Sequence, residues 1–113
     1  MYKKQRWYKY EKIAQDFLIQ KGFSILDTNF TIRWWEIDII SQKDNIVSFV
    51  EVKWVSKYTD FQDYITASKL KALERTAKHW IYKNDDESIL EYRFDLILVE
   101  NDKVIDFIEW ITS

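Results

Sequence analysis

Residues 34–54 read WWEIDIISQKDNIVSFVEVKW, two apolar segments joined by a polar one. Their composition predicts strands at about 34–41 and 46–54, with QKDN as the turn between them. The two strands also contain three carboxylates and a lysine, namely Glu36, Asp38, Glu51 and Lys53. Because burying an unpaired charge is costly, charged residues in such apolar strands require partners or a chemical role.

Two amphipathic helices are expected on either side of this hairpin. The first covers residues 3–21 and ends before Gly22, the only glycine of the chain, which suits a left-handed C-terminal cap. The second covers about 67–83 and begins after Thr66, a suitable N-cap. The residues at helical spacing on the apolar faces are Trp7, Tyr10, Ala14, Phe17, Leu18 and Lys21 in the first helix and Leu70, Leu73, Ala77, Trp80 and Ile81 in the second.

Further strands are expected at 23–32, 89–100 and 103–111, and the last two turn around Asn101-Asp102. Residues 55–65 show no regular pattern. The order α-β-β-β-α-β-β predicts one mixed sheet flanked by helices, an α/β or α+β fold. A chain of 113 residues is long enough for one domain with one core, so we expect residues 1–113 to form a single domain.

Composition excludes several kinds of site. The chain has no cysteine and only one histidine, His79, which excludes disulfides, thiolate nucleophiles and multi-histidine metal sites. A metal would be held by oxygen ligands, which favours Mg²⁺, Mn²⁺ or Ca²⁺. No segment is apolar enough to span a membrane or to act as a secretory signal, so a soluble cytoplasmic protein is expected.

Charge is segregated along the chain although the net charge is only −2. Residues 69–83 carry five Lys or Arg against one Glu, whereas residues 84–113 carry two against nine acidic residues. In the second helix Lys71, Arg75 and Lys78 form a basic ridge that, with Lys69, could follow a nucleic-acid backbone. A solvated helix face has the same pattern, and this alternative stays open.

The register of the central hairpin decides whether its charged residues meet. Side chains alternate across a strand, so Glu51 and Lys53 share one face of their strand. A turn with an even number of residues places Asp38 on that same face, and an odd loop without a bulge places it on the other. Both short turns that we consider, Lys43-Asp44 and residues 43–46, are even, which favours a shared face.

Two neighbouring carboxylates repel unless a positive charge lies between them. A divalent cation bound by Asp38, Glu51 and the carbonyl of Val52 would supply that charge. Lys53 would then stabilise developing negative charge on a phosphodiester while the cation lowers the pKa of an attacking water molecule. Ordinary cross-strand ion pairs are the alternative. The apolar neighbours on these strands favour a site cut into the edge of the core.

Glu11 lies about 60° from Ala14, at the margin of the apolar stripe of the first helix. From there its carboxylate could reach a metal on the sheet. The alternative is a salt bridge at the helix edge, with Lys12 or a residue near Lys9.

The spacing D-x12-E-V-K, from Asp38 to Glu51-Val52-Lys53, resembles the PD-(D/E)xK nuclease motif, and Glu11 matches the additional acidic residue of the Holliday-junction-resolvase branch. Over nearly its whole length the chain resembles the YraN family of small bacterial endonuclease-like proteins. The blocks that carry this resemblance are YEKIAQDFLIQKGFSILDTNF, EIDII, VSFVEVKW, ITASKLKAL and RFDLILVE.

This resemblance implies a restriction-endonuclease-like core and a metal-dependent nuclease that acts on DNA with Mg²⁺ or Mn²⁺. Asp38, Glu51 and Lys53 fall on the presumed active-site positions, with Glu11 and Glu36 as acidic neighbours. Resolvase-like enzymes act as dimers, so the resemblance also implies a homodimer. Trp35 and Gln62 stand where the family usually has glycine, which affects backbone approach and loop shape.

Three functions are therefore carried forward. The first is a divalent-metal-dependent nuclease that hydrolyses DNA phosphodiester bonds, including branched or damaged DNA. The second is a non-catalytic nucleic-acid-binding module with the same fold. The third is a structural or adaptor protein that uses its acidic C-terminal hairpin and its aromatic residues as an interface.

Overall fold

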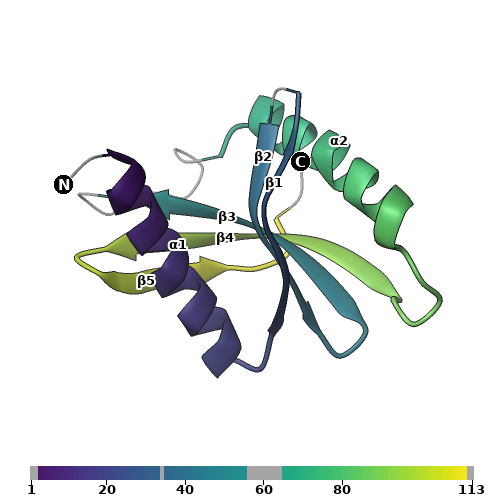
Figure 1. Cartoon of the computed structure of the whole chain (residues 1–113), viewed down its shortest axis with the longest axis horizontal. Coiled ribbons are helices and arrows are strands. Elements are labelled where there is room, and N and C mark those ends of the chain that lie inside the picture. Colours follow the sequence, from purple (N-terminus) through teal and green to yellow (C-terminus); the bar gives the residue numbers. More distant parts are fainter. Residues whose placement is uncertain (1–2, 34, 56–64, 112–113) are drawn as a thin grey trace.

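The structure, a computed structural model, describes residues 3–33, 35–55 and 65–111, with side chains from Tyr8 onward. It contains one sheet of five strands and two helices (Figure 1). In chain order the elements are α1 (Lys3–Gln20), β1 (Ser24–Ile32), β2 (Trp35–Lys43), β3 (Ile46–Trp54), α2 (Ala67–Asn84), β4 (Glu91–Glu100) and β5 (Lys103–Ile108).

The strands lie in the sheet in the order β1-β2-β3-β4-β5. Neighbours pair antiparallel except β3 and β4, which are parallel. A parallel pair needs a long crossover connection, and α2 forms most of it. This mixed sheet with its α-β-β-β-α-β-β order confirms the predicted α+β fold.

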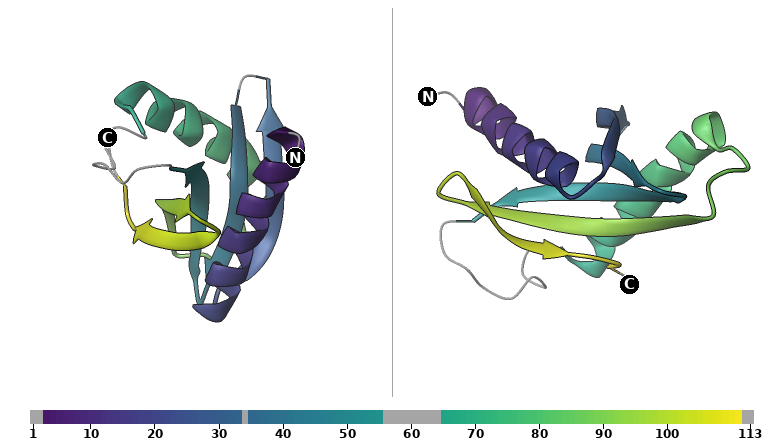
Figure 2. Two further views of the ribbon diagram at one scale, coloured as in Figure 1. Left: turned by 90° about the vertical axis from the view of Figure 1, so that its left-hand side faces the viewer. Right: turned by 90° about the horizontal axis from the view of Figure 1, so that it is seen from below.

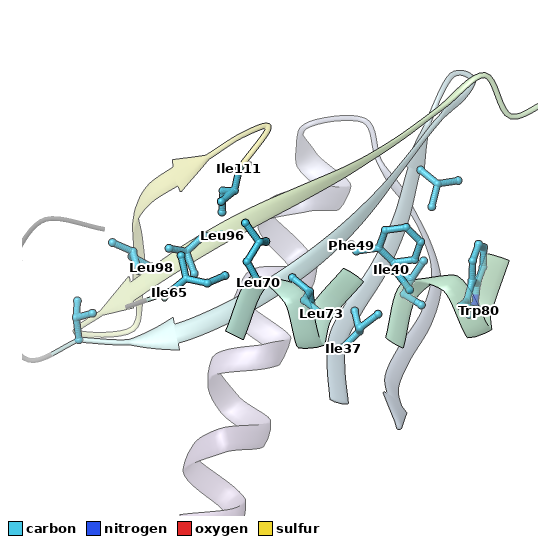
Figure 3. Packing of buried hydrophobic residues seen from close by; sticks show 13 residues of the cluster. Ile37, Ile40, Phe49, Ile65, Leu70, Leu73, Trp80, Leu96, Leu98 and Ile111 are labelled. Atoms are coloured by element: carbon cyan, nitrogen blue, oxygen red, sulfur yellow. The ribbon is translucent and has the colours of Figure 1, made fainter. Parts of the chain in front are cut away.

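The two helices cover opposite faces of the sheet (Figure 2). On the α2 side, Phe49 and Leu73 belong to a cluster that also includes Trp80 and Leu96 (Figure 3). On the α1 side, Ala14 and Leu18 pack against residues of the central strands. The middle of β3 and of β4 is thus buried on both faces, which explains apolar runs such as residues 96–99 of β4.

The predicted boundaries agree with the structure to within a few residues, with three corrections. The turn of the central hairpin is the pair Asp44-Asn45 rather than QKDN, because β2 continues to Lys43. Strand β5 ends at Ile108 instead of residue 111, and Trp110 beyond it has a positive φ of 59°. Lys21, expected in the apolar stripe, is exposed, with its ammonium 5.3 Å from the centre of the Phe17 ring.

Both predicted caps are observed. Gly22 has a φ of 97°, a conformation that favours glycine, and it ends α1. The hydroxyl of Thr66 accepts a hydrogen bond from the N–H of Lys69 and begins α2. Most of the predicted irregular segment, residues 56–64, lies outside the described residues. Neither helix that the structure describes is long and apolar enough to cross a lipid bilayer.

Candidate active site

The structure brings Asp38 and Glu51 together. The ladder between β2 and β3 runs from Lys43–Ile46 at the turn to Ile39–Val50, and one further step in this register places Asp38 opposite Glu51. Both residues are buried, with exposed fractions of 3% and 6%, and their carboxyl groups lie close enough for Glu51 to raise the pKa of Asp38. The even-numbered turn therefore produces the shared position expected from the sequence.

The pairing of β2 with β3 ends just before Asp38. The ladder between β2 and β3 stops at Ile39–Val50, and Ile37 packs in the α2-side cluster whereas Ile39 packs in the α1-side cluster. A strict alternation would put these two residues on the same face. The Oδ2 atom of Asp38 accepts a hydrogen bond of 2.8 Å from the backbone N–H of Val52. This side chain therefore takes the place of a strand partner for β3.

The neighbouring strand is also irregular at this level. Asn29 lies between the pairs Thr28–Ile39 and Phe30–Ile37, opposite Asp38, and it has a φ of 53°. Asparagine tolerates this left-handed conformation better than most residues. The irregular backbone of β1 and β2 thus coincides with the position of Asp38.

Burial perturbs both acids. Removal from water, followed by the charge of Glu51 and a hydrogen bond with it, raises the pKa of Asp38 from 3.8 to about 9, although the Val52 N–H opposes this shift. Burial also raises the pKa of Glu51, while its hydrogen bond with Asp38 and the charge of Lys53 lower it. At neutral pH the pair retains a proton between its two carboxyl groups when no cation is present.

Among the described residues, two lysines act on the charge of Glu51. The ammonium of Lys53 lies 4.0 Å from Oε1 of Glu51, at the outer limit of an ion pair, and the lysine is partly exposed. Lys69, in the first turn of α2, also favours the charged form of Glu51, whereas Glu36 disfavours it. The second oxygen of Glu51, Oε2, is buried and has no hydrogen-bond partner among the described residues. An unpartnered carboxylate oxygen here is a ready ligand for a cation.

Glu11 reaches the same level of the sheet from α1. It is 4% exposed, and its Oε1 accepts a hydrogen bond of 2.5 Å from Nδ2 of Asn29. Of the basic residues near it, Lys12 pairs with Asp16 at 3.2 Å and Lys9 with Asp102 at 3.0 Å. Asn29 connects Glu11 to the strand position facing Asp38, a role that sequence reasoning missed. The sequence feature that could have revealed this role is an asparagine inside a predicted strand, where asparagine is normally rare.

The two carboxylates provide part of the oxygen coordination that a hard divalent cation needs. Within residues 3–33, 35–55 and 65–111, no three Asp, Glu or His side chains converge closely enough to form a metal site by themselves. Two carboxylates, one with an unpartnered oxygen, supply hard oxygen ligands, and backbone carbonyls and water commonly complete such a shell. Val52 contacts the site through its backbone N–H, which donates a hydrogen bond to Asp38. Ligation of a metal by the Val52 carbonyl stays a prediction.

The four predicted basic residues of α2 do not all lie on the same side of the helix. At about 100° per residue, Lys69 lies about 160° around the helix from Lys71. Lys69 instead influences Glu51, whereas Lys71, Arg75 and Lys78 are exposed on the outer side. The ridge of Lys71, Arg75 and Lys78 is exposed as expected, and nucleic-acid binding by these three residues and Lys69 stays a prediction.

The two departures from the family pattern have different outcomes. Trp35 begins β2 and packs against the α2-side cluster, so the bulky residue is accommodated by the core. Gln62 lies outside the described residues.

Comparisons with known proteins agree with the sequence blocks. The model of "Uncharacterised protein family UPF0102" matches residues 10–99. A UPF0102 protein of Flavobacterium psychrophilum is 42% identical over 96 residues, which cover 82% of this chain and 78% of that protein. UPF0102 proteins of Campylobacter fetus and Vibrio parahaemolyticus are 37% and 33% identical, and these alignments cover 86% and 88% of this chain and 85% and 84% of the relatives.

Solved structures give more distant similarities. An XisH family protein from Nostoc punctiforme has a TM-score of 0.44 at 8% identity, and an fdxN element excision controlling factor from Anabaena variabilis has 0.45 at 11%. Each alignment covers 88% of this chain and 98% of the other. The family match and the relatives over most of the chain establish that this protein belongs to the UPF0102 family, also called YraN.

Proposed function

We propose that this protein is a divalent-metal-dependent nuclease that hydrolyses phosphodiester bonds of DNA, with Mg²⁺ or Mn²⁺ as its cofactor. The observation that carries the proposal is the buried pair Asp38 and Glu51, which interact while the Oε2 atom of Glu51 has no hydrogen-bond partner among the described residues. Such a pair is unfavourable as a purely structural feature, because two carboxyl groups are removed from water and the ion pair with Lys53, at 4.0 Å, is weak. A cation bound between the two carboxylates would offset the cost of removing them from water.

Each residue has a distinct task in the proposed reaction. Asp38 and Glu51 would hold the cation, and the Val52 N–H fixes the Oδ2 atom of Asp38. When bound, the cation would neutralise the scissile phosphate and make a water molecule easier to deprotonate. Lys53, partly exposed at the same end of β3, would bind the phosphate oxygen on which negative charge develops. Glu11 acts through Asn29 as a positioning residue for this part of the sheet.

The test is cleavage of duplex, branched and single-stranded DNA in the presence of Mg²⁺ and then Mn²⁺. Wild-type protein is compared with Lys53→Ala and with Lys12→Ala, an exposed lysine of α1, all purified identically. We expect metal-dependent cleavage that Lys53→Ala abolishes and Lys12→Ala retains. Cleavage that is equal in all three preparations would indicate a contaminant and contradict the proposal.

A non-catalytic nucleic-acid-binding module is the second candidate. The observation that favours it is the lack of a three-acid cluster among the described residues, together with the three exposed basic residues on α2. Nucleic-acid binding that persists in EDTA, does not change in Asp38→Ala and is never followed by cleavage would establish this function in place of the first.

A further inference from the structure

Basic side chains from two separate elements surround one open hollow on the surface. Ile32 and Arg33, at the end of β1, lie across from Arg75, Lys78 and His79 on α2, and together they line a cavity of about 610 Å³. Figure 1 shows the closed end of the β1–β2 hairpin beside α2. Arg33 and His79 were not identified as candidates from the sequence, because only the folded hairpin brings them to this helix.

The cations of this hollow lack counter-ions. Among the described residues, Arg33, Arg75 and Lys78 form no ion pair, whereas Lys9, Lys12 and Arg93 elsewhere do. Glu74 is the acidic neighbour on α2, and it forms no salt bridge with these residues either. Like charges that are held together without compensation repel each other, so an anion in the hollow would stabilise them. Two guanidinium groups are suited to bidentate contacts with phosphate oxygens.

The distance between the hollow and the buried acids can be estimated from the rise per residue of the chain. Lys69 marks the end of α2 beside Glu51, and at 1.5 Å per residue Arg75 and Lys78 lie about 9 and 14 Å further along the helix. Arg33 and Asp38 are five residues apart in the sequence, so at about 3.3 Å per residue they lie at most about 16 Å apart. A nucleic-acid strand carries one charge per about 3.4 Å of duplex axis, so this range corresponds to about three to five nucleotides.

We infer that the hollow between Arg33 and α2 is a clamp for the phosphate backbone, about three to five nucleotides from the scissile bond. The inference rests on the proposed function for the position of the scissile bond, and the clamp itself can be tested without catalysis. It implies that the substrate is a nucleic-acid strand that extends beyond the cleavage point on one side. A mononucleotide, or a strand that ends close to the scissile bond, would not reach both the clamp and the buried acids.

The experiment measures binding of labelled duplex DNA in EDTA, where no cleavage can occur, over a series of salt concentrations. The clamp variant is Arg33→Gln/Arg75→Gln, and the control is Lys12→Gln/Lys103→Gln, which removes the same charge from exposed residues of α1 and β5. Each phosphate contact contributes about 0.9 to the slope of log K against log salt. The clamp variant should lose about 1.8 from this slope, while the control retains the wild-type slope.

Several outcomes separate the clamp from the nuclease. An unchanged slope in the clamp variant, an equal loss in both variants, or no DNA binding by the wild-type protein would overturn the clamp. A reduced slope together with no cleavage at any metal concentration would support the clamp and contradict the nuclease. Titration with inorganic phosphate alone distinguishes a free-phosphate site, because tight phosphate binding with an unchanged DNA slope would also overturn the inference.

Discussion

The carboxylate of Asp38 is bound by the backbone N–H of Val52, the residue between Glu51 and Lys53, at 2.8 Å. One side chain of β2 is thereby fixed to the part of β3 that carries the other two candidate site residues. Displacement of either strand would therefore break this bond as well as the contact between the acids. Metal binding, acid–base behaviour and local stability should consequently be coupled, and the following predictions use this coupling.

The metal-free protein should lose stability as the pH rises. Asp38 has an ordinary pKa of 3.8 and a folded-state pKa of about 9, so between these values the folded state binds more protons than the unfolded state. The free energy of unfolding therefore falls as the pH rises from about 4 to about 9. Denaturant unfolding at several pH values in EDTA measures this slope.

Asp38→Asn is the matched variant for that slope. Burial also raises the pKa of Asp95, so part of the pH dependence belongs to that residue and persists in the variant. The difference between wild type and Asp38→Asn isolates the contribution of the site. Identical slopes would show that Asp38 is not protonated in the metal-free protein.

A divalent cation should raise the midpoint of thermal unfolding. A ligand that binds only the folded state stabilises it by about 2.7 kcal/mol at a concentration of 100 times its Kd. We expect Mn²⁺ to have this effect on wild type and on Glu109→Gln, an exposed acid, but not on Asp38→Asn or Glu51→Gln. An equal shift in all four proteins would place the metal elsewhere.

Asn29 should tolerate glycine better than alanine. Glycine adopts the φ of 53° freely, whereas alanine in a left-handed conformation costs about 1–2 kcal/mol. Both changes remove the hydrogen bond to Glu11, so their difference reports the backbone alone. Urea unfolding of Asn29→Gly and Asn29→Ala provides the comparison, and an alanine variant that is as stable as the glycine variant would contradict the strained conformation.

A second buried pair, Arg93 and Asp95 on β4, should be important for stability. Asp95 is fully buried and accepts hydrogen bonds from Arg93 Nε and from the Trp110 N–H, each at 2.9 Å. Asp95→Ala leaves the largely buried Arg93 without this partner and should cost about 3–5 kcal/mol. Glu109 pairs with the same arginine from an exposed position, so Glu109→Ala should cost less than about 1 kcal/mol. Chemical denaturation ranks the two variants, and a reversed order would refute this assignment.

The sequence predicts the features that depend on local pattern. Helical periodicity and the caps at Gly22 and Thr66 locate both helices, and the even number of turn residues places Asp38 beside Glu51. The end of the β2–β3 pairing before Asp38 is not predictable in this way, because the hydrophobic pattern of β2 does not report where its pairing stops or that Asn29 beside it has a positive φ. The proximity of Arg33 to α2 is missed for a similar reason, since residues more than 40 positions apart meet only after the sheet has twisted.

The order of strands in the sheet also has a consequence for folding. Strands β1, β2 and β3 form a meander of neighbours, and Asn29, Asp38 and Glu51 all belong to it. Strand β4 pairs with β3 through residues 45 positions apart, as in Ile46–Glu91, so closing this loop costs more chain entropy than forming the meander. The acidic site is thus assembled from contacts of short sequence separation. Its burial is completed only when the C-terminal half of the chain docks beside it.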